Sequence, residues 1–215
     1  MNEGSLVVRQ LSELDPEDVF RELAALHAEQ IRGGVLPLLG NGFLATLYRE
    51  IAASKSSSVH QATLNGKTVG FVAGARDIWR CAFGLRLPGY LRLASILGVR
   101  IWHPNVARKF FGALAYPFRG PSTPLADNPP RQDKHRAELL AIAVTSKAQG
   151  QGVGRALVGA FEQTLRGTVV SYSVTTNAGD AQSNAFYGAV GFKKAGQKRH
   201  HDLLIQIYTK KLNGD

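Results

Sequence analysis

Apolar residues recur along this chain with two different spacings, and each spacing predicts a different kind of element. Steps of three and four residues make one apolar face of a helix, whereas short β-branched runs are typical of strands. The predicted helices cover residues 15–31, 41–51, 153–166 and 180–191. The predicted strands cover residues 6–11, 59–64, 67–75, 138–145, 168–176, 192–197 and 203–211. This mixture of elements favours an α+β fold.

Polar residues and glycines mark where several of these elements begin. Asp15 stands before a proline and is the expected N-cap of the first helix, and Asn41 is the expected cap of the second. Asp180 is likewise an expected N-cap. Asn65 and Gly66 separate two apolar runs and predict a tight hairpin, because both residues tolerate positive φ.

One stretch, residues 141–157, combines a strand, a glycine-rich turn and the start of a helix. Gly150, Gly152 and Gly154 let the backbone turn tightly and approach a ligand, because they lack a Cβ atom. The first turn of the following helix has free backbone N–H groups, which suit an anion such as a phosphate. A nucleoside triphosphate loop is excluded because its Lys-Ser/Thr pair is missing. The third glycine comes one residue too early for a dinucleotide fingerprint.

A second motif follows this loop. The two patterns are Gln149-x-x-Gly152-x-Gly154 and Asn184-Ala-Phe-Tyr187-x-x-x-Gly191-Phe192. Together they resemble the GNAT superfamily of N-acetyltransferases, with the clear resemblance over residues 136–192. It implies a twisted, mixed and mostly antiparallel sheet of about seven strands, flanked by helices. It also implies acetyl-coenzyme A (acetyl-CoA) as cosubstrate, no metal, and direct acetyl transfer to an amine in a ternary complex.

The resemblance assigns coenzyme contacts to individual residues. The backbone of Ile142, Ala143 and Val144 would contact the pantetheine arm and the thioester carbonyl. Asn184 would either hydrogen-bond that arm or face water. The family often has an asparagine seven residues before its tyrosine, where this chain has Asp180. The pyrophosphate would be held by the amides of the loop, with charge added by two cations. These residues are Lys147, Gln149, Gly150, Gln151, Gly152, Val153, Gly154 and Arg155.

Two residues are expected to move protons. Tyr187 matches the family's general acid, which protonates the coenzyme sulfur as it leaves. The alternative for Tyr187 is a tyrosine on the core face of a helix. Glu138, which begins the central strand, is the candidate base for the acceptor amine, acting directly or through water. An exposed glutamate at a strand end is the alternative, and His135 is the rival base.

A long basic insert, residues 77–135, separates the predicted strands 67–75 and 138–145. Its apolar spacing predicts helices within residues 91–97 and 106–115. A proline-rich extended loop is expected after them. Four interpretations stay open: a lid or wall over the acceptor site, a homodimer surface, membrane-surface contact by basic helices, and plain packing.

Length and composition bear on the number of domains, the net charge, disulfide bonding and the location of the protein. The chain of 215 residues fits a single domain over residues 1–215, and its net charge of +10 suits an anionic coenzyme. One cysteine excludes an intrachain disulfide. With neither a signal peptide nor a bilayer-spanning run in the sequence, a cytoplasmic protein is expected.

No nucleic-acid-binding signature is found in the sequence, so nucleic acid is not an expected partner. The expected acceptor is a small-molecule amine, such as an amino sugar. A peptide or protein amine is one alternative, and a non-catalytic acyl-CoA-sensing module on the same fold is another.

Overall fold

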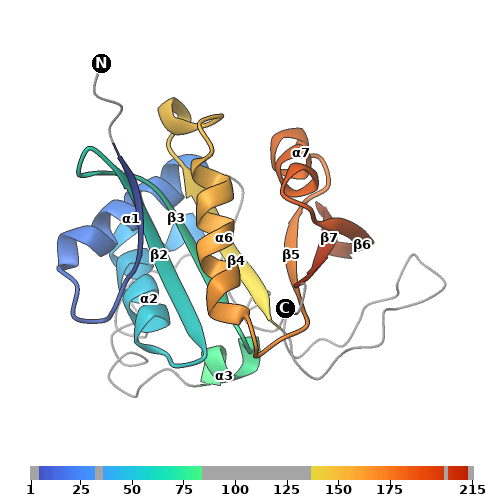
Figure 1. Ribbon diagram of the computed structural model, residues 1–215, viewed down its shortest axis with the longest axis horizontal. Helices are drawn as coiled ribbons and strands as arrows, with labels where there is room; N and C mark the ends of the chain where they lie inside the picture. Colours follow the sequence, from blue (N-terminus) through green and yellow to red (C-terminus); the bar gives the residue numbers. More distant parts are fainter. Residues whose placement is uncertain (1–4, 32–35, 84–136, 201–202, 213–215) are drawn as a thin grey trace.

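The strands of the described chain form one seven-stranded sheet in the order β1-β2-β3-β4-β5-β7-β6 (Figure 1). The computed structural model describes residues 5–31, 36–83, 137–200 and 203–212. The strands are β1 (Leu6–Gln10), β2 (Ser57–Leu64), β3 (Lys67–Ala75), β4 (Glu138–Val144), β5 (Ser171–Asn177), β6 (Lys193–His200) and β7 (Leu203–Lys211). Neighbouring strands are antiparallel, except that β4 and β5 are parallel. The predicted α+β fold with a mixed, mostly antiparallel sheet is confirmed.

Helices cover both faces of this sheet (Figure 1). On one face, α1 (Glu17–Gln30) and α2 (Asn41–Ala53) bury an apolar core with β2, β3 and β4. On the opposite face, α6 (Val153–Leu165) and α7 (Ala181–Ala189) share a second core with the strands. The shorter elements are η1 (Leu36–Leu39), α3 (Ile78–Phe83) and η2 (Ser146–Ala148). The sheet therefore separates an α1–α2 face from an α6–α7 face.

Two of the local signals are confirmed in detail. Asn65 and Gly66 form the turn between β2 and β3, with φ of 51° and 75°. The carboxylate of Asp180 accepts a hydrogen bond from the amide of Ser183 at 3.0 Å and caps α7. At Asp180 the side chain caps a backbone amide, and at Asn65 and Gly66 the residues adopt the positive φ that the turn needs. Both effects are local, so distant contacts do not change these structures.

The other two predicted N-caps are wrong. Pro16 and Gly40 hold the N-cap positions of α1 and α2. The carboxylate of Asp15 instead accepts a hydrogen bond from the amide of Ser12 at 2.7 Å and pairs with Arg9 at 2.6 Å. A turn and an ion pair before the helix therefore use the oxygens that a cap would need.

Close packing between α6 and β3 depends on one glycine. A Cβ atom at Gly74 would lie 2.2 Å from the ring of Phe161, which is itself buried. Glycine in the middle of a strand often marks such a close approach. The helix that follows the glycine-rich loop, α6, therefore packs closely against the sheet.

Most of the basic insert lies outside the described residues. Its first part forms α3, which the apolar pattern did not predict. The predicted helices within residues 91–97 and 106–115 lie outside the description, as does His135. The lid, homodimer and membrane-contact interpretations therefore stay predictions, and so does the single domain over 1–215. Among the helices that are described, none combines the length and apolar character needed to cross a membrane.

Two buried histidines make the stability of the fold depend on pH. His27 and His60 are 3% and 4% exposed, and burial lowers the pKa of each imidazole from 6.5 to about 4. Both are neutral when folded but take up a proton below pH 6.5 when unfolded. The part of the protein's stability that depends on these two histidines is therefore fully present above pH 6.5 and is lost as the pH falls towards 4. We expect the free energy of unfolding to drop by up to about 3 kcal/mol per histidine across this window.

Urea unfolding at pH 7 and pH 4.5 measures this drop. The variant His60→Gln should lose part of it, because a glutamine does not titrate. In the described structure the Nδ1 atom of His60 has no hydrogen-bond partner, so the substitution breaks no bond there. Equal free energies of unfolding at the two pH values in the unmodified protein would contradict the expectation.

Candidate active site

The sheet is split between β4 and β5. These strands pair in register at Glu138 with Ser173 and at Leu139 with Val174, next to the start of β4. From Ala141 to Val144, β4 pairs with β3 alone. Strand polar groups of β4 that point away from β3 therefore lack a ladder partner along this part of the strand.

A β-bulge coincides with the start of the split. Ala73 of β3 lies opposite Ala141, whereas the next residue, Gly74, lies opposite Leu139. Leu140 is therefore the extra residue on β4, and its side chain is 38% exposed. Because a bulge bends its strand, it accounts for the divergence of β4 from β5.

The glycine-rich loop between η2 and α6 has backbone amides that the described protein leaves without hydrogen-bond partners. Gly150 and Gly152 have φ of 77° and 81°, and Cβ atoms at either position would meet nothing within 4 Å. The first helical bond of α6 runs from the amide of Ala156 to the carbonyl of Gly152, at 3.0 Å. Within the described residues, no hydrogen bond engages the amides from 150 to 155. These donors stand at the N-terminus of α6, where an anion is stabilised.

Side chains of the loop hold it in place. Gln149 donates from Nε2 to the carbonyl oxygen of Val144 at 3.1 Å and accepts at Oε1 from Gln182 at 2.8 Å. The same Nε2 lies 3.4 Å from Oε1 of Gln30 in α1. Gln149 therefore connects α1, β4 and α7. Sequence spacing gave no signal for Gln30 or Gln182, because both contacts depend on how distant helices dock.

The other loop residues also have defined contacts. Gln151 donates a hydrogen bond to the carbonyl of Lys147 at 2.8 Å, and both side chains are exposed. Arg155 donates from Nη2 to the carbonyl of Ala189 at 3.2 Å, at the C-terminal end of α7. A Cβ atom on Gly154 would lie 2.8 Å from the ring of Phe186. Gly154 thus allows α6 and α7 to approach, while Gly150 and Gly152 supply the turn.

Tyr187 is buried in an aromatic cluster on the α6–α7 face. It is 6% exposed, and its ring lies 5.5 Å from that of Phe192 and 5.7 Å from that of Tyr208. Burial, with a smaller effect from the nearby Asp180 carboxylate, raises the pKa of the Tyr187 hydroxyl above its usual value. That hydroxyl has no hydrogen-bond partner among the described residues, and its oxygen is not completely shielded from solvent. It stays protonated and can donate a proton.

Asn184 is engaged by the protein itself. Its Nδ2 donates to the backbone carbonyl oxygens of Asn177 and Ala178, at 3.0 and 3.2 Å. Its Oδ1 accepts a hydrogen bond from the Tyr208 hydroxyl at 2.8 Å. These contacts fix the start of α7 against β5 and β7. The predicted contact with a pantetheine arm stays a prediction.

Glu138 lies on the opposite face of the sheet from Tyr187. Strand partners share a face, and Glu138 pairs with Ala75, which is buried in the α1–α2 core. Leu139 and Val174, the next pair along the split, belong to the same core as Tyr187. Ile142 and Ala143 alternate in the same way, Ile142 towards α6 and Ala143 towards α1 and α2. The two candidate proton-transfer residues thus lie on either side of the sheet near the closed end of the split.

A pocket of about 350 Å³ lies elsewhere, between α1 and α2. Its walls include Phe20, Arg21, Thr46 and Arg49, and it shares no lining residue with the loop or the split. This pocket is therefore separate from the candidate site that the loop and the split form.

Comparison with known proteins agrees with this geometry. Residues 37–192 match the model of the acetyltransferase (GNAT) family. No curated protein matches the chain in sequence. Among solved structures, the chain is similar to the ribosomal-protein-S18-alanine N-acetyltransferase of Escherichia coli, with 14% identity and a TM-score of 0.56, over 98% of this chain and 97% of that one.

Two further solved structures show the same fold. A protein of Pyrococcus horikoshii OT3 has 15% identity and a TM-score of 0.58, over 97% of this chain and 99% of that one. An acetyltransferase of the GNAT family from Streptococcus pneumoniae has 15% identity and a TM-score of 0.58, over 97% of this chain and all of that one, 100%. At these identities the likeness concerns the fold.

Proposed function

Because the chain belongs to the acetyltransferase (GNAT) family, we propose that it transfers the acetyl group of acetyl-CoA to an amine by direct attack in a ternary complex. The family makes it an acyltransferase with acetyl-CoA as cosubstrate. The acceptor, the ternary mechanism and the roles of individual residues are the proposal. The observation that carries it is the loop of unengaged amides at residues 150–155, next to the split sheet.

The loop would bind the diphosphate of the coenzyme. Amides at the N-terminus of α6 have no hydrogen-bond partner among the described residues, and Gly150 and Gly152 leave the space around the turn free of side chains. Lys147 is exposed beside the loop and adds positive charge. Arg155 keeps further N–H donors beyond its bond to the Ala189 carbonyl.

The split would hold the pantetheine arm and the thioester. Between residues 141 and 144, backbone groups of β4 on the side away from β3 have no ladder partner. An N–H donor there can stabilise the negative charge that develops on the thioester oxygen. A strand that is anchored on its other side to β3 positions such a donor rigidly, which is what preorganised stabilisation requires.

Proton transfers would be divided between the two faces. The amine nitrogen forms a bond to the acetyl carbon and gives up a proton to Glu138, directly or through a water. The carbon–sulfur bond breaks, and the leaving sulfur takes the proton of the Tyr187 hydroxyl, which burial keeps protonated. Glu138 then releases its proton to solvent, and a proton from solvent restores Tyr187. The placement of Glu138 and Tyr187 on opposite faces supports this division, because donor and acceptor substrates can enter from different sides.

A thiol-release assay tests the proposal. The full chain is mixed with acetyl-CoA and a panel of amines: small amines, amino sugars and short peptides. We expect free thiol to appear at a rate that depends on the amine, with an amino sugar or another small amine ahead of the peptides. The fastest rates with peptides would replace the small-molecule acceptor by a peptide acceptor.

Binding of acetyl-CoA without thiol release is the outcome that distinguishes the alternative function, a non-catalytic sensor. Calorimetric binding of acetyl-CoA with no thiol release across the whole panel would favour a non-catalytic acyl-CoA sensor. Absence of coenzyme binding would overturn both functions.

A further inference from the structure

A polar row crosses the second half of the sheet at the level of Glu138. Glu138 of β4 pairs with Ser173 of β5, Ser173 pairs with Thr209 of β7, and Thr209 pairs with Lys193 of β6. Paired residues in adjacent strands point to the same face. A carboxylate, two hydroxyls and an ammonium group therefore follow one another across four strands on one face.

The neighbouring residues of the same strands point to the opposite face of the sheet. Val174 and Tyr208 pair with each other and belong to the core under α6 and α7. Lys210 points to that face as well, where it forms a 2.6 Å ion pair with Glu162 of α6. The alternation of the strands then places Ser173, Thr209 and Lys211 on the α1–α2 side, which is the side of Glu138.

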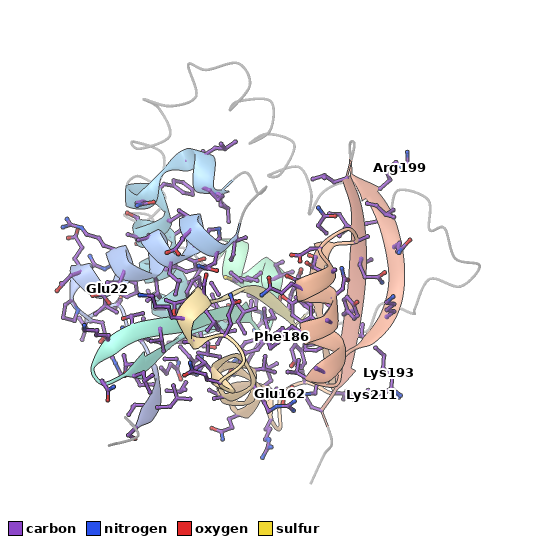
Figure 2. The ribbon with its side chains drawn as sticks, turned by 90° about the horizontal axis from the view of Figure 1, so that it is seen from above. Glu22, Glu162, Phe186, Lys193, Arg199 and Lys211 are labelled. Atoms are coloured by element: carbon purple, nitrogen blue, oxygen red, sulfur yellow. The ribbon has the colours of Figure 1, made fainter. Side chains whose placement is uncertain are left out.

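Two lysines meet at the far end of the row. Lys211 lies two residues beyond Thr209 on β7, so it is the diagonal neighbour of Lys193 on the same face. Both lysines are exposed, and Figure 2 shows them at one end of the β6–β7 hairpin, with Arg199 at the other. No acidic side chain in the described structure pairs with either one. Their charges are therefore available to an anion.

Protection of a sheet edge explains one of these lysines but not the other. Charged residues on an edge strand discourage pairing with other chains, and Lys193 lies on the edge strand β6. Lys211 lies on β7, which is an inner strand between β5 and β6. A second cation that points to the same face from an inner strand calls for a different explanation.

We infer that the acetyl acceptor is an anionic, hydroxyl-bearing amine, whose phosphate or carboxylate group binds Lys193 and Lys211. This inference rests on the proposed function, because it places the amine beside Glu138. The hydroxyls of Ser173 and Thr209 lie between the two ends and can hydrogen-bond the body of the acceptor. Three strand spacings separate the backbones of β4 and β6, which is about 14 Å, and an extended lysine side chain can span part of that distance.

Matched acceptors test the inference. Acetyl transfer is measured with glucosamine and with glucosamine 6-phosphate, two amines that differ by one anionic group. We expect kcat/KM to favour the phosphate by at least about tenfold, the size of a charge-assisted pair of hydrogen bonds. The double variant Lys193→Gln/Lys211→Gln should reduce that preference towards unity.

Lys194→Gln is the matched control. Lys194 is an exposed lysine one residue from Lys193, but it pairs with Tyr208 and points to the α6–α7 face. It should keep the preference for the phosphate. Equal rates for the two amines in the unmodified protein, or a preference that survives in the double variant, would overturn the inference.

A binding measurement separates this inference from the proposed function. Lysines of the full chain are acylated with a small reagent in the presence of glucosamine or of glucosamine 6-phosphate, and mass spectrometry locates the modified positions. Protection of Lys193 and Lys211 by the phosphate alone is the expected result, and unprotected lysines would reject the anion site. If neither amine supports thiol release although the lysines are protected, the proposed transfer to such acceptors fails while the anion site stands.

Discussion

Replacing Gly152 by glutamate is expected to raise the dissociation constant of coenzyme A by at least about 100-fold. The φ of 81° at this position costs a residue with a side chain about 1–2 kcal/mol. The new carboxylate would also stand beside the loop amides and repel a diphosphate. A Cβ atom at this position meets nothing within 4 Å, so the substitution should leave the packing of α6 intact.

Calorimetric titration with coenzyme A measures this effect, and a thermal unfolding curve checks that the variant folds. Gly159→Glu is the matched control, because Gly159 lies within the same helix without a positive φ, and a Cβ atom there would likewise meet nothing within 4 Å. The control should bind coenzyme A as the unmodified protein does. Undiminished binding by a folded Gly152→Glu variant would show that the loop does not hold the diphosphate.

Replacing Tyr187 by phenylalanine is expected to lower kcat by about 100-fold, the usual contribution of a general acid. Phenylalanine keeps the ring that packs against Phe192 and Tyr208, and it removes only the hydroxyl group. The KM for acetyl-CoA should change little, because the hydroxyl acts on the leaving sulfur. Since burial raises the pKa of Tyr187, titration of this hydroxyl should not reduce kcat in the unmodified protein between pH 6 and pH 9.

Tyr172→Phe is the control for this substitution. Tyr172 belongs to the same aromatic cluster, but its hydroxyl donates to Glu162 at 2.5 Å, so its loss should lower stability while kcat stays near that of the unmodified protein. Steady-state kinetics from pH 6 to pH 9 compares the two variants. An unchanged kcat in Tyr187→Phe would remove Tyr187 from the chemistry and leave it as a core tyrosine, the alternative that its burial also allows.

Signals confined to a few residues of sequence were the most predictable parts of this protein. Asn65 and Gly66 make their turn, and Asp180 caps α7, because each acts on its own backbone. The turn conformations of Gly150 and Gly152 follow the same logic. Asp15 shows the limit: Ser12 and Arg9 compete for its carboxylate, and neither contact follows from the helix-start pattern.

Features set by register or docking were harder to anticipate. The bulge at Leu140 and the pairing of Glu138 with Ser173 depend on how β4 aligns with both neighbours. Asn184 looked like a ligand contact in sequence, whereas the fold surrounds its amide with carbonyls and Tyr208. The row that ends at Lys193 appears only when four strands are aligned.

The central claim is that amides of residues 150–155 bind the diphosphate of coenzyme A. Amide NMR spectra of the full chain, recorded with coenzyme A and with pantetheine, which lacks the diphosphate, test it most directly. We expect the signals of Gly150, Gly152 and Gly154 to shift with coenzyme A and to stay in place with pantetheine. Signals of these glycines that stay fixed while coenzyme A shifts others would contradict the claim.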